Sequence, residues 1–132
     1  MATLVSLTPN LAVASVNETV DYYKTYFGFS LLASVPDSGL LNWAMIMRDG
    51  VTLMFQSHES LQEDLQELNI TKTGSRGTFF IEVENIREIY QQCKGQVKII
   101  SDMRTTFYGK HEFTVEDLNG FYLTFAEDVP AS

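Results

Sequence analysis

Few residues of this 132-residue chain carry side chains that are common in catalytic or metal sites. The chain has two histidines, His58 and His111, and one cysteine, Cys93. A catalytic divalent ion needs about three protein ligands, mostly imidazole or carboxylate. We expect His58 to lie in a solvated loop beside Glu59, and His111 has no obvious carboxylate partner. His111 fits either a histidine that forms a hydrogen bond with a ligand or one that is simply packed or exposed. One histidine without a carboxylate partner is not a metal site, so we predict none here.

Covalent and acid–base catalysis also find little support in the sequence. There is no G-x-S-x-G motif, and Cys93 falls on the apolar stripe of a predicted helix, where a thiol is buried and inert. The glycine-containing stretch 73–77 lacks the spacing of a phosphate-binding loop. Glu82 and Glu112 lie on predicted strands and could act as bases if desolvated, but solvated or salt-bridged carboxylates are more common. We therefore predict no catalytic residue, and enzymatic activity is the weaker hypothesis.

A second set of side chains suits binding rather than catalysis. Strand alternation, with a two-residue turn at Asp49-Gly50, places aromatic, thioether, hydroxyl and amide groups on one face. Such a surface suits an uncharged or aromatic organic molecule, although the same residues could simply fill the core. Loop residues Phe107 and Tyr108 fit either a rim of the site or a dimer interface. The predicted ligand-binding residues are Thr8, Asn10, Trp43, Met45, Met54, Gln56, Thr78, Phe80, Tyr108, His111, Tyr122 and Thr124.

The first half of the chain is predicted to contain one helix and four strands. Ser15 and Glu18 form a capping box that begins the helix, and Gly28 ends it. Apolar residues between these two points recur at helical spacing. Alternating or apolar runs bounded by turn residues predict strands over 4–14, 29–35, 41–47 and 51–57.

The second half repeats this order after a polar connector over 58–75, which carries the spacing of a short helix. Asn85 is predicted to cap the second helix, with Glu88 at the capping-box position, and Gly95 to end it. Strands are predicted over 77–83, 97–101, 110–116 and 121–126, with a loop over 104–109.

The two halves match at a fixed distance of 70 residues without a gap. Ser15 falls on Asn85, and Gly50 on Gly120. The repeat is too long for a solenoid unit and too short for a comfortable domain of its own. We predict one α+β domain over 1–132, made of two βαβββ repeats at about 4–57 and 76–127. They would form a curved, barrel-like mixed sheet with helices outside and a shared cleft.

Composition excludes several classes of protein. The net charge of −8 argues against nucleic-acid binding, which needs clustered lysine and arginine, and mildly favours cationic ligands. There is no apolar run of membrane-spanning length and no signal-peptide pattern. The single cysteine permits no disulfide within the chain, which fits a cytoplasmic protein.

Two segments and the duplicated βαβββ pattern resemble the vicinal oxygen chelate superfamily. The segments are V-x-x-V-N-E-T-V-D-Y-Y-K-T-Y-F-G-F over 13–29 and E-D-L-N-G-F-Y-L-T-F over 116–125. This superfamily includes glyoxalase I, bleomycin-resistance proteins, fosfomycin-resistance enzymes and extradiol dioxygenases. The stretch Y-G-K-H-E-F over 108–113 is most similar to the bleomycin-resistance branch. The resemblance covers roughly residues 4–127 and implies a homodimer.

The resemblance also implies four positions for metal ligands. In this chain they are Thr8, Met54, Thr78 and Thr124. A hydroxyl is a weak ligand and a thioether suits only soft metals, so none of the four suits a catalytic divalent ion. We therefore expect no metal and no cofactor.

Three hypotheses follow for the function. The first is a metal-independent binding protein that sequesters an antibiotic or an aromatic metabolite. The second is a metal-dependent lyase or dioxygenase with ligands relocated around His111 and Glu112. The third is a structural or regulatory protein whose cleft is packed shut.

Overall fold

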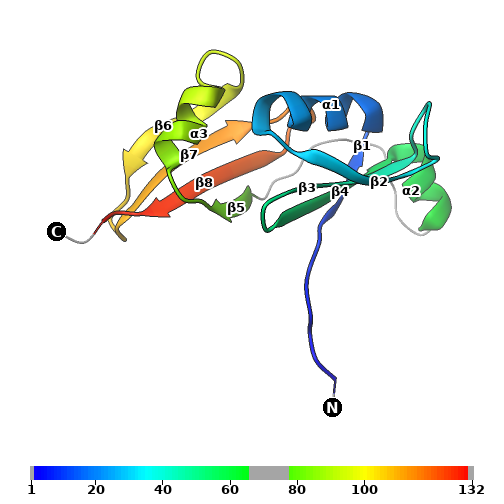
Figure 1. The fold of residues 1–132 in the computed structure, drawn as a ribbon, viewed down its shortest axis with the longest axis horizontal. Helices are drawn as coiled ribbons and strands as arrows, with labels where there is room; N and C mark the ends of the chain where they lie inside the picture. Colours follow the sequence, from blue (N-terminus) through cyan, green and yellow to red (C-terminus); the bar gives the residue numbers. More distant parts are fainter. Residues whose placement is uncertain (1, 66–77, 131–132) are drawn as a thin grey trace. The chain divides into compact units, whose positions relative to one another are not determined.

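A computed structural model describes residues 2–65 and 78–130, and these form two compact units (Figure 1). Unit 1 covers residues 1–72 and unit 2 covers residues 73–132. In the described residues, each unit contains one four-stranded mixed sheet with a helix along one face. The predicted pair of βαβββ repeats and the α+β class are therefore confirmed.

Unit 1 contains four strands and two helices. Its elements are β1 (Asn10–Val13), α1 (Val16–Phe27), β2 (Ser30–Val35), β3 (Trp43–Arg48), β4 (Val51–Ser57) and α2 (His58–Asp64). The strand order is β1-β4-β3-β2, with β1 parallel to β4 and the other pairs antiparallel. No described helix is long and apolar enough to cross a bilayer.

Helix α1 begins and ends where the sequence predicts. The Ser15 hydroxyl accepts a hydrogen bond from the Glu18 amide at 3.1 Å, and Gly28 ends the helix at φ 67°. That left-handed conformation is accessible to glycine at little cost. Tyr23 is fully buried on the inner face of α1, and its ring lies 5.2 Å from that of Phe55 on β4. Helix α1 therefore fixes one face of the sheet as the core face.

Strand β1 is shorter than the predicted strand over 4–14. The parallel register pairs Asn10 with Met54, so continuing it would bring Leu7 to Val51, where β4 begins. Residues 4–6 consequently have no neighbouring strand, and Leu4 and Leu7 are exposed. Pro9 also lacks an amide hydrogen for a strand ladder. The N-terminal part of this prediction is wrong because β4 is too short to pair with it.

Residues 78–130 of unit 2 repeat the order of β1 to β4, with one helix among them. Its elements are β5 (Thr78–Glu82), α3 (Ile86–Cys93), β6 (Lys98–Thr105), β7 (Lys110–Glu116) and β8 (Tyr122–Asp128). The strand order is β5-β8-β7-β6, with β5 parallel to β8. Phe113 on β7 is fully buried between the rings of Tyr90 on α3 and Phe125 on β8. Strand β6 includes Arg104 and Thr105, which were predicted to lie in a loop.

The start of α3 differs from the predicted capping box. Asn85 occupies the cap position, but it is left-handed at φ 61° and its side chain accepts no hydrogen bond from the first turn. The Glu127 carboxylate on β8 accepts the amide hydrogens of Asn85 and Ile86 at 2.7 and 3.0 Å instead. A negative charge at a helix N-terminus also interacts favourably with the helix dipole. The cap therefore comes from another strand, which local sequence spacing cannot reveal.

We expect Glu127→Ala to destabilise the protein more than Glu88→Ala, because Glu88 accepts only a side-chain hydrogen bond from Asn85. The hydrogen bonds from Ile86 and Asn85 hold the pKa of Glu127 below its ordinary value of 4.5. A lowered folded-state pKa means that its contribution is complete above pH 4.5 and is lost as pH falls through the folded-state value. Urea unfolding at several pH values should show the difference shrinking in acid. A difference that does not change with pH would contradict this cap.

Candidate functional site

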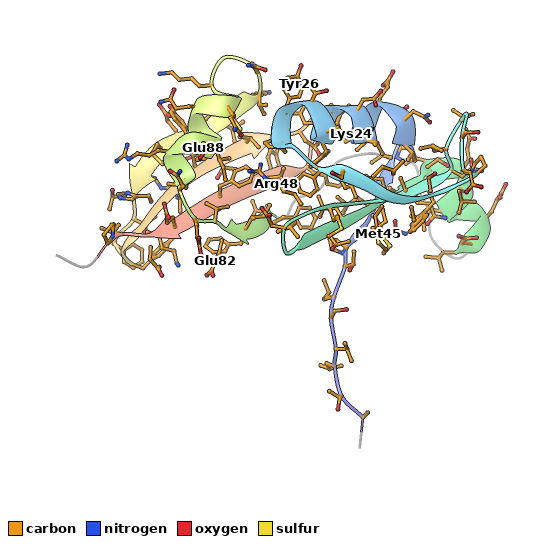
Figure 2. The ribbon with its side chains drawn as sticks, viewed as in Figure 1. Lys24, Tyr26, Met45, Arg48, Glu82 and Glu88 are labelled. Carbon is orange, nitrogen blue, oxygen red and sulfur yellow. The ribbon has the colours of Figure 1, made fainter. Side chains whose placement is uncertain are left out.

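Each sheet has one face under its helix and one face that the helix leaves uncovered. In unit 1, the uncovered face carries Trp43, Met45 and Met54, which are half-buried. Met45 pairs directly with Met54, and Trp43 pairs with Gln56. Figure 2 shows Met45 on the side of the sheet away from α1. The two-residue turn at Asp49-Gly50 therefore places this thioether and aromatic surface as expected.

Gln56 is part of the framework of this face. Its side-chain oxygen accepts a hydrogen bond from Asn10 at 2.9 Å. Its side-chain nitrogen donates to Ser60 and Asp64 on α2 at 2.9 and 2.7 Å. These bonds join β1, β4 and α2, so Gln56 supports the neighbouring thioethers while its own hydrogen-bonding groups are engaged.

The four positions that the resemblance assigns to metal ligands carry no suitable donor set. Met54 lies in the thioether surface, and Thr124 shares a hydrogen bond of 2.8 Å with Thr114. Thr78 is exposed at the start of β5, and Thr8 is half-buried just before β1. Within residues 2–65 and 78–130, no group of three histidine, cysteine or acidic side chains could hold a metal ion. The residues present do not fit a catalytic divalent ion.

Unit 2 corrects the predicted orientation of His111. Its neighbour Phe113 points toward α3, and side chains two apart on a strand share a face. His111 therefore lies on the helix side, where its Nδ1 is 3.0 Å from the Thr105 hydroxyl. Glu112 points to the uncovered face instead, together with Thr114 and Thr124.

The cause is a difference of one residue between the two hairpins. In unit 1, four residues lie between Met47 and its partner Thr52. In unit 2, five residues lie between the equivalent pair Glu116 and Tyr122, and Gly120 adopts φ 86° in this longer turn. As a result β8 follows β4 by 70 residues, but β7 follows β3 by only 69. A shift of one residue moves every side chain of a strand to the other face.

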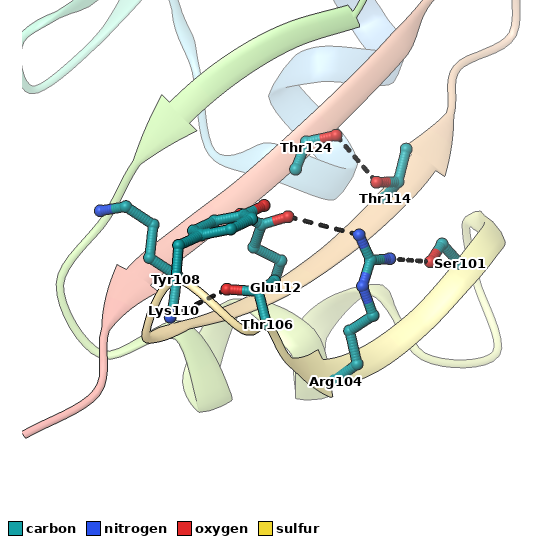
Figure 3. A network of polar contacts seen from close by, with 8 residues as sticks. All are labelled: Ser101, Arg104, Thr106, Tyr108, Lys110, Glu112, Thr114 and Thr124. Atoms are coloured by element: carbon teal, nitrogen blue, oxygen red, sulfur yellow. Dashed lines mark hydrogen bonds and ion pairs between the residues drawn. The ribbon is translucent and has the colours of Figure 1, made fainter.

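Glu112 is the centre of a polar network on the uncovered face of unit 2 (Figure 3). Its side chain is 3% exposed. One carboxylate oxygen accepts a hydrogen bond from the Tyr108 hydroxyl at 2.6 Å, and the other lies 3.6 Å from the Arg104 guanidinium. Arg104 also donates to the Ser101 hydroxyl at 2.5 Å. The hydrogen bond to Glu112 raises the pKa of the Tyr108 phenol, so Tyr108 stays a neutral donor.

Aromatic rings lie around this network. Phe107 is fully exposed, and its ring meets that of Tyr108 edge to face at a centroid distance of 5.0 Å. Phe80 on β5 is half exposed and pairs with Thr124. Tyr122 on β8 pairs with Glu116. The uncovered face of unit 2 thus combines a buried charge with accessible rings, whereas that of unit 1 is mainly thioether and aromatic.

His58 differs from its predicted place in a solvated loop. It is the first residue of α2 and only partly exposed. Its Nε2 is buried and, within the described part of the chain, has no hydrogen-bond partner. The rest of the predicted connector, residues 66–75, lies outside the described residues.

Comparison with known proteins places the chain in a family. The sequence profile of the Glyoxalase/Bleomycin resistance protein/Dioxygenase superfamily matches residues 4–125. The chain belongs to this superfamily. No curated protein matches the sequence.

Several solved structures share the fold of this protein over almost the whole chain. A bleomycin-binding protein complexed with bleomycin has 21% identity and a TM-score of 0.66, covering 95% of this chain and 99% of its own. TioX from Micromonospora sp. ML1 has 19% identity and a TM-score of 0.74, with coverage of 95% and 99%. A protein of unknown function from Agrobacterium tumefaciens str. C58 has 15% identity and a TM-score of 0.80, covering 98% of both chains. At these identities the likeness concerns the fold.

Proposed function

We propose that this superfamily member binds a small organic molecule without a metal ion. The observation that carries the proposal is that threonine or methionine occupies all four implied ligand positions. At the same time, the sheet faces opposite α1 and α3 retain accessible aromatic and thioether groups. Aromatic and thioether surfaces with a few polar groups are typical of sites for organic ligands. The bleomycin complex of a structural neighbour makes an antibiotic a ligand class to test first.

The metal-dependent alternative is weakened by the register of β7. That hypothesis needs metal ligands around His111 and Glu112. These two side chains extend from opposite faces of β7. Neighbouring residues in that orientation cannot share one ion. A packed structural role is weakened by the exposure of Phe80, Phe107 and Tyr108.

We further propose that the protein acts as a homodimer. In the described residues, each sheet ends in strands that pair on one side only, β1 and β2 in unit 1 and β5 and β6 in unit 2. Unpaired strand edges invite pairing with another chain, and a second copy is the partner that symmetry favours.

The ligand test uses Trp43, the only tryptophan of the chain. We expect its fluorescence to change saturably on titration with metal-free bleomycin or with flat aromatic amines. At a free ligand concentration about 100-fold above Kd, the ligand should add about 2.7 kcal/mol to the free energy of unfolding. Met45→Ala should weaken binding, whereas Leu40→Ala, an exposed loop residue, should not. If no compound of either class binds by fluorescence or calorimetry, the proposal is wrong; binding of the amines alone would exclude only the antibiotic.

A further inference from the structure

We propose that Glu112 is the anchor for a positively charged group of the ligand, so that the preferred ligand is an organic cation with a flat aromatic group. The proposal rests on the proposed binding function and names the chemical class of the ligand. It concerns unit 2 alone, where Glu112, Arg104 and Tyr108 are on β7, β6 and the loop between them.

The Glu112 carboxylate has unused hydrogen-bonding capacity. An ionised carboxylate can accept about four hydrogen bonds. Within the described part of the chain it accepts one, from Tyr108, and its ion pair with Arg104 at 3.6 Å is too long for a hydrogen bond. A carboxylate that is only 3% exposed is normally fully paired, because burial of a charge without partners is unfavourable. A ligand cation would supply the missing partner.

The two side chains that contact the Glu112 carboxylate, Arg104 and Tyr108, are partly exposed and can move without moving the backbone. The Arg104 side chain is 52% exposed, and its hydrogen bond to Ser101 does not require contact with Glu112. Tyr108 is half exposed. The residue of β8 paired with Glu112 is the fully buried Ala126, so a ligand would approach from the side of Arg104 and Tyr108. An ammonium or guanidinium group of a ligand can therefore take the place of Arg104 beside the carboxylate.

Two other acidic groups on this face have closer cationic partners, and a third, Glu82, is 74% exposed to solvent. Glu116 pairs with Lys98 at 3.0 Å, and Asp128 pairs with Lys110 at 2.7 Å. Lys110 also lies 3.7 Å from Glu82. Glu112 is buried, and its distance to a cationic side chain is longer than that of Glu116 on the same strand. We therefore assign the anchor to Glu112.

The aromatic residues define the second part of the ligand. Tyr108 holds its ring beside the carboxylate, and the exposed Phe107 ring contacts that of Tyr108. A cation over such a ring is attracted by its electron-rich face. The net charge of −8 also raises the local concentration of cations and lowers that of anions. Together these features favour an aromatic amine over a neutral or carboxylated analogue.

The test compares three probes with the same ring system: 2-naphthylmethylamine, 2-naphthylmethanol and 2-naphthoate. Calorimetric titration of the full chain should show the amine binding about tenfold or more tightly than the alcohol, the size of one hydrogen bond to a charged group. Equal affinity of amine and alcohol would refute the cation anchor but leave small-molecule binding intact. Tightest binding of naphthoate, lost in Arg104→Gln, would assign the site to carboxylates instead. If none of the three probes binds, this inference fails, and the bleomycin titration then decides separately whether the proposed function fails.

Matched variants separate the anchor from general electrostatics. Glu112→Gln and Glu116→Gln remove the same charge at positions four residues apart on one face of β7. We expect Glu112→Gln to abolish the preference for the amine and Glu116→Gln to retain it; equal loss in both would overturn the assignment. Arg104→Gln should strengthen amine binding several-fold by removing the competing guanidinium. An unchanged affinity in Arg104→Gln would mean that the ion pair is purely structural, and this readout remains even if Glu112→Gln folds poorly.

Discussion

Phe113→Ala is expected to lower the free energy of unfolding by about 3–5 kcal/mol, the usual result of truncating a buried phenylalanine. Phe113 is fully buried, and its ring lies 5.2 Å from the rings of both Tyr90 and Phe125. Truncation removes these contacts and leaves a cavity at the point where α3 packs on the sheet. Urea unfolding followed by circular dichroism measures the loss.

Phe107→Ala is the control for this prediction. It removes the same side chain from a position that is fully exposed. We expect its stability to change by less than about 0.5 kcal/mol, which is normal for surface substitutions. Similar losses in the two variants would mean that unit 2 does not pack α3 on the sheet as described.

Asp117→Ala is expected to lower the free energy of unfolding by about 2 kcal/mol or more, because it leaves two backbone donors without an acceptor. Asp117 is 5% exposed, and its Oδ1 accepts the amide hydrogens of Asn119 and Phe121 at 2.8 and 2.9 Å. These bonds hold the turn between β7 and β8. The effect is measured by urea unfolding.

Asp117→Asn is the matched variant, since an amide oxygen can accept the same two hydrogen bonds. We expect it to lose about half as much stability as Asp117→Ala, because hydrogen bonds to a charged acceptor are roughly twice as strong. If both variants were as stable as the original protein, the turn would not depend on these bonds.

The elements of the fold could be predicted from local sequence chemistry. Helix α1 begins where the Ser15 side chain accepts the amide hydrogen of Glu18, and it ends at Gly28, which adopts the left-handed conformation. The strand at Val51–Ser57 follows a two-residue turn that Asp49-Gly50 specifies. Where the deciding partner lies far along the chain, prediction fails: the cap of α3 is Glu127, 41 residues from Ile86.

The faces of the candidate site were predictable throughout unit 1 and for β5 and β8 of unit 2, but not for β7. The parity of Trp43, Met45 and Met54 follows from the tight turn, so their common face could be inferred. In unit 2, an ungapped repeat of 70 residues does not account for the longer turn after Glu116. It therefore predicts that His111 lies on the face that Glu112 occupies in the structure. The sequence does contain a signal, because D-L-N-G favours a longer hairpin loop than D-G.

The network around Glu112 depends on a further feature that sequence reasoning missed. Arg104 was placed in a loop, whereas β6 continues to Thr105 and pairs Arg104 directly with Glu112. That pairing crosses two register irregularities in β6, which a strand pattern alone does not specify. The ion pair is consequently visible only in the structure.

The most direct test of ligand binding without a metal is a calorimetric titration of protein that elemental analysis shows to be metal free after chelation. The titrant is whichever compound produces the largest change in Trp43 fluorescence. We predict the same Kd before and after chelation, and no change on adding zinc, nickel, manganese or iron(II). Loss of binding on chelation, restored by a stoichiometric amount of one of these ions, would contradict the account.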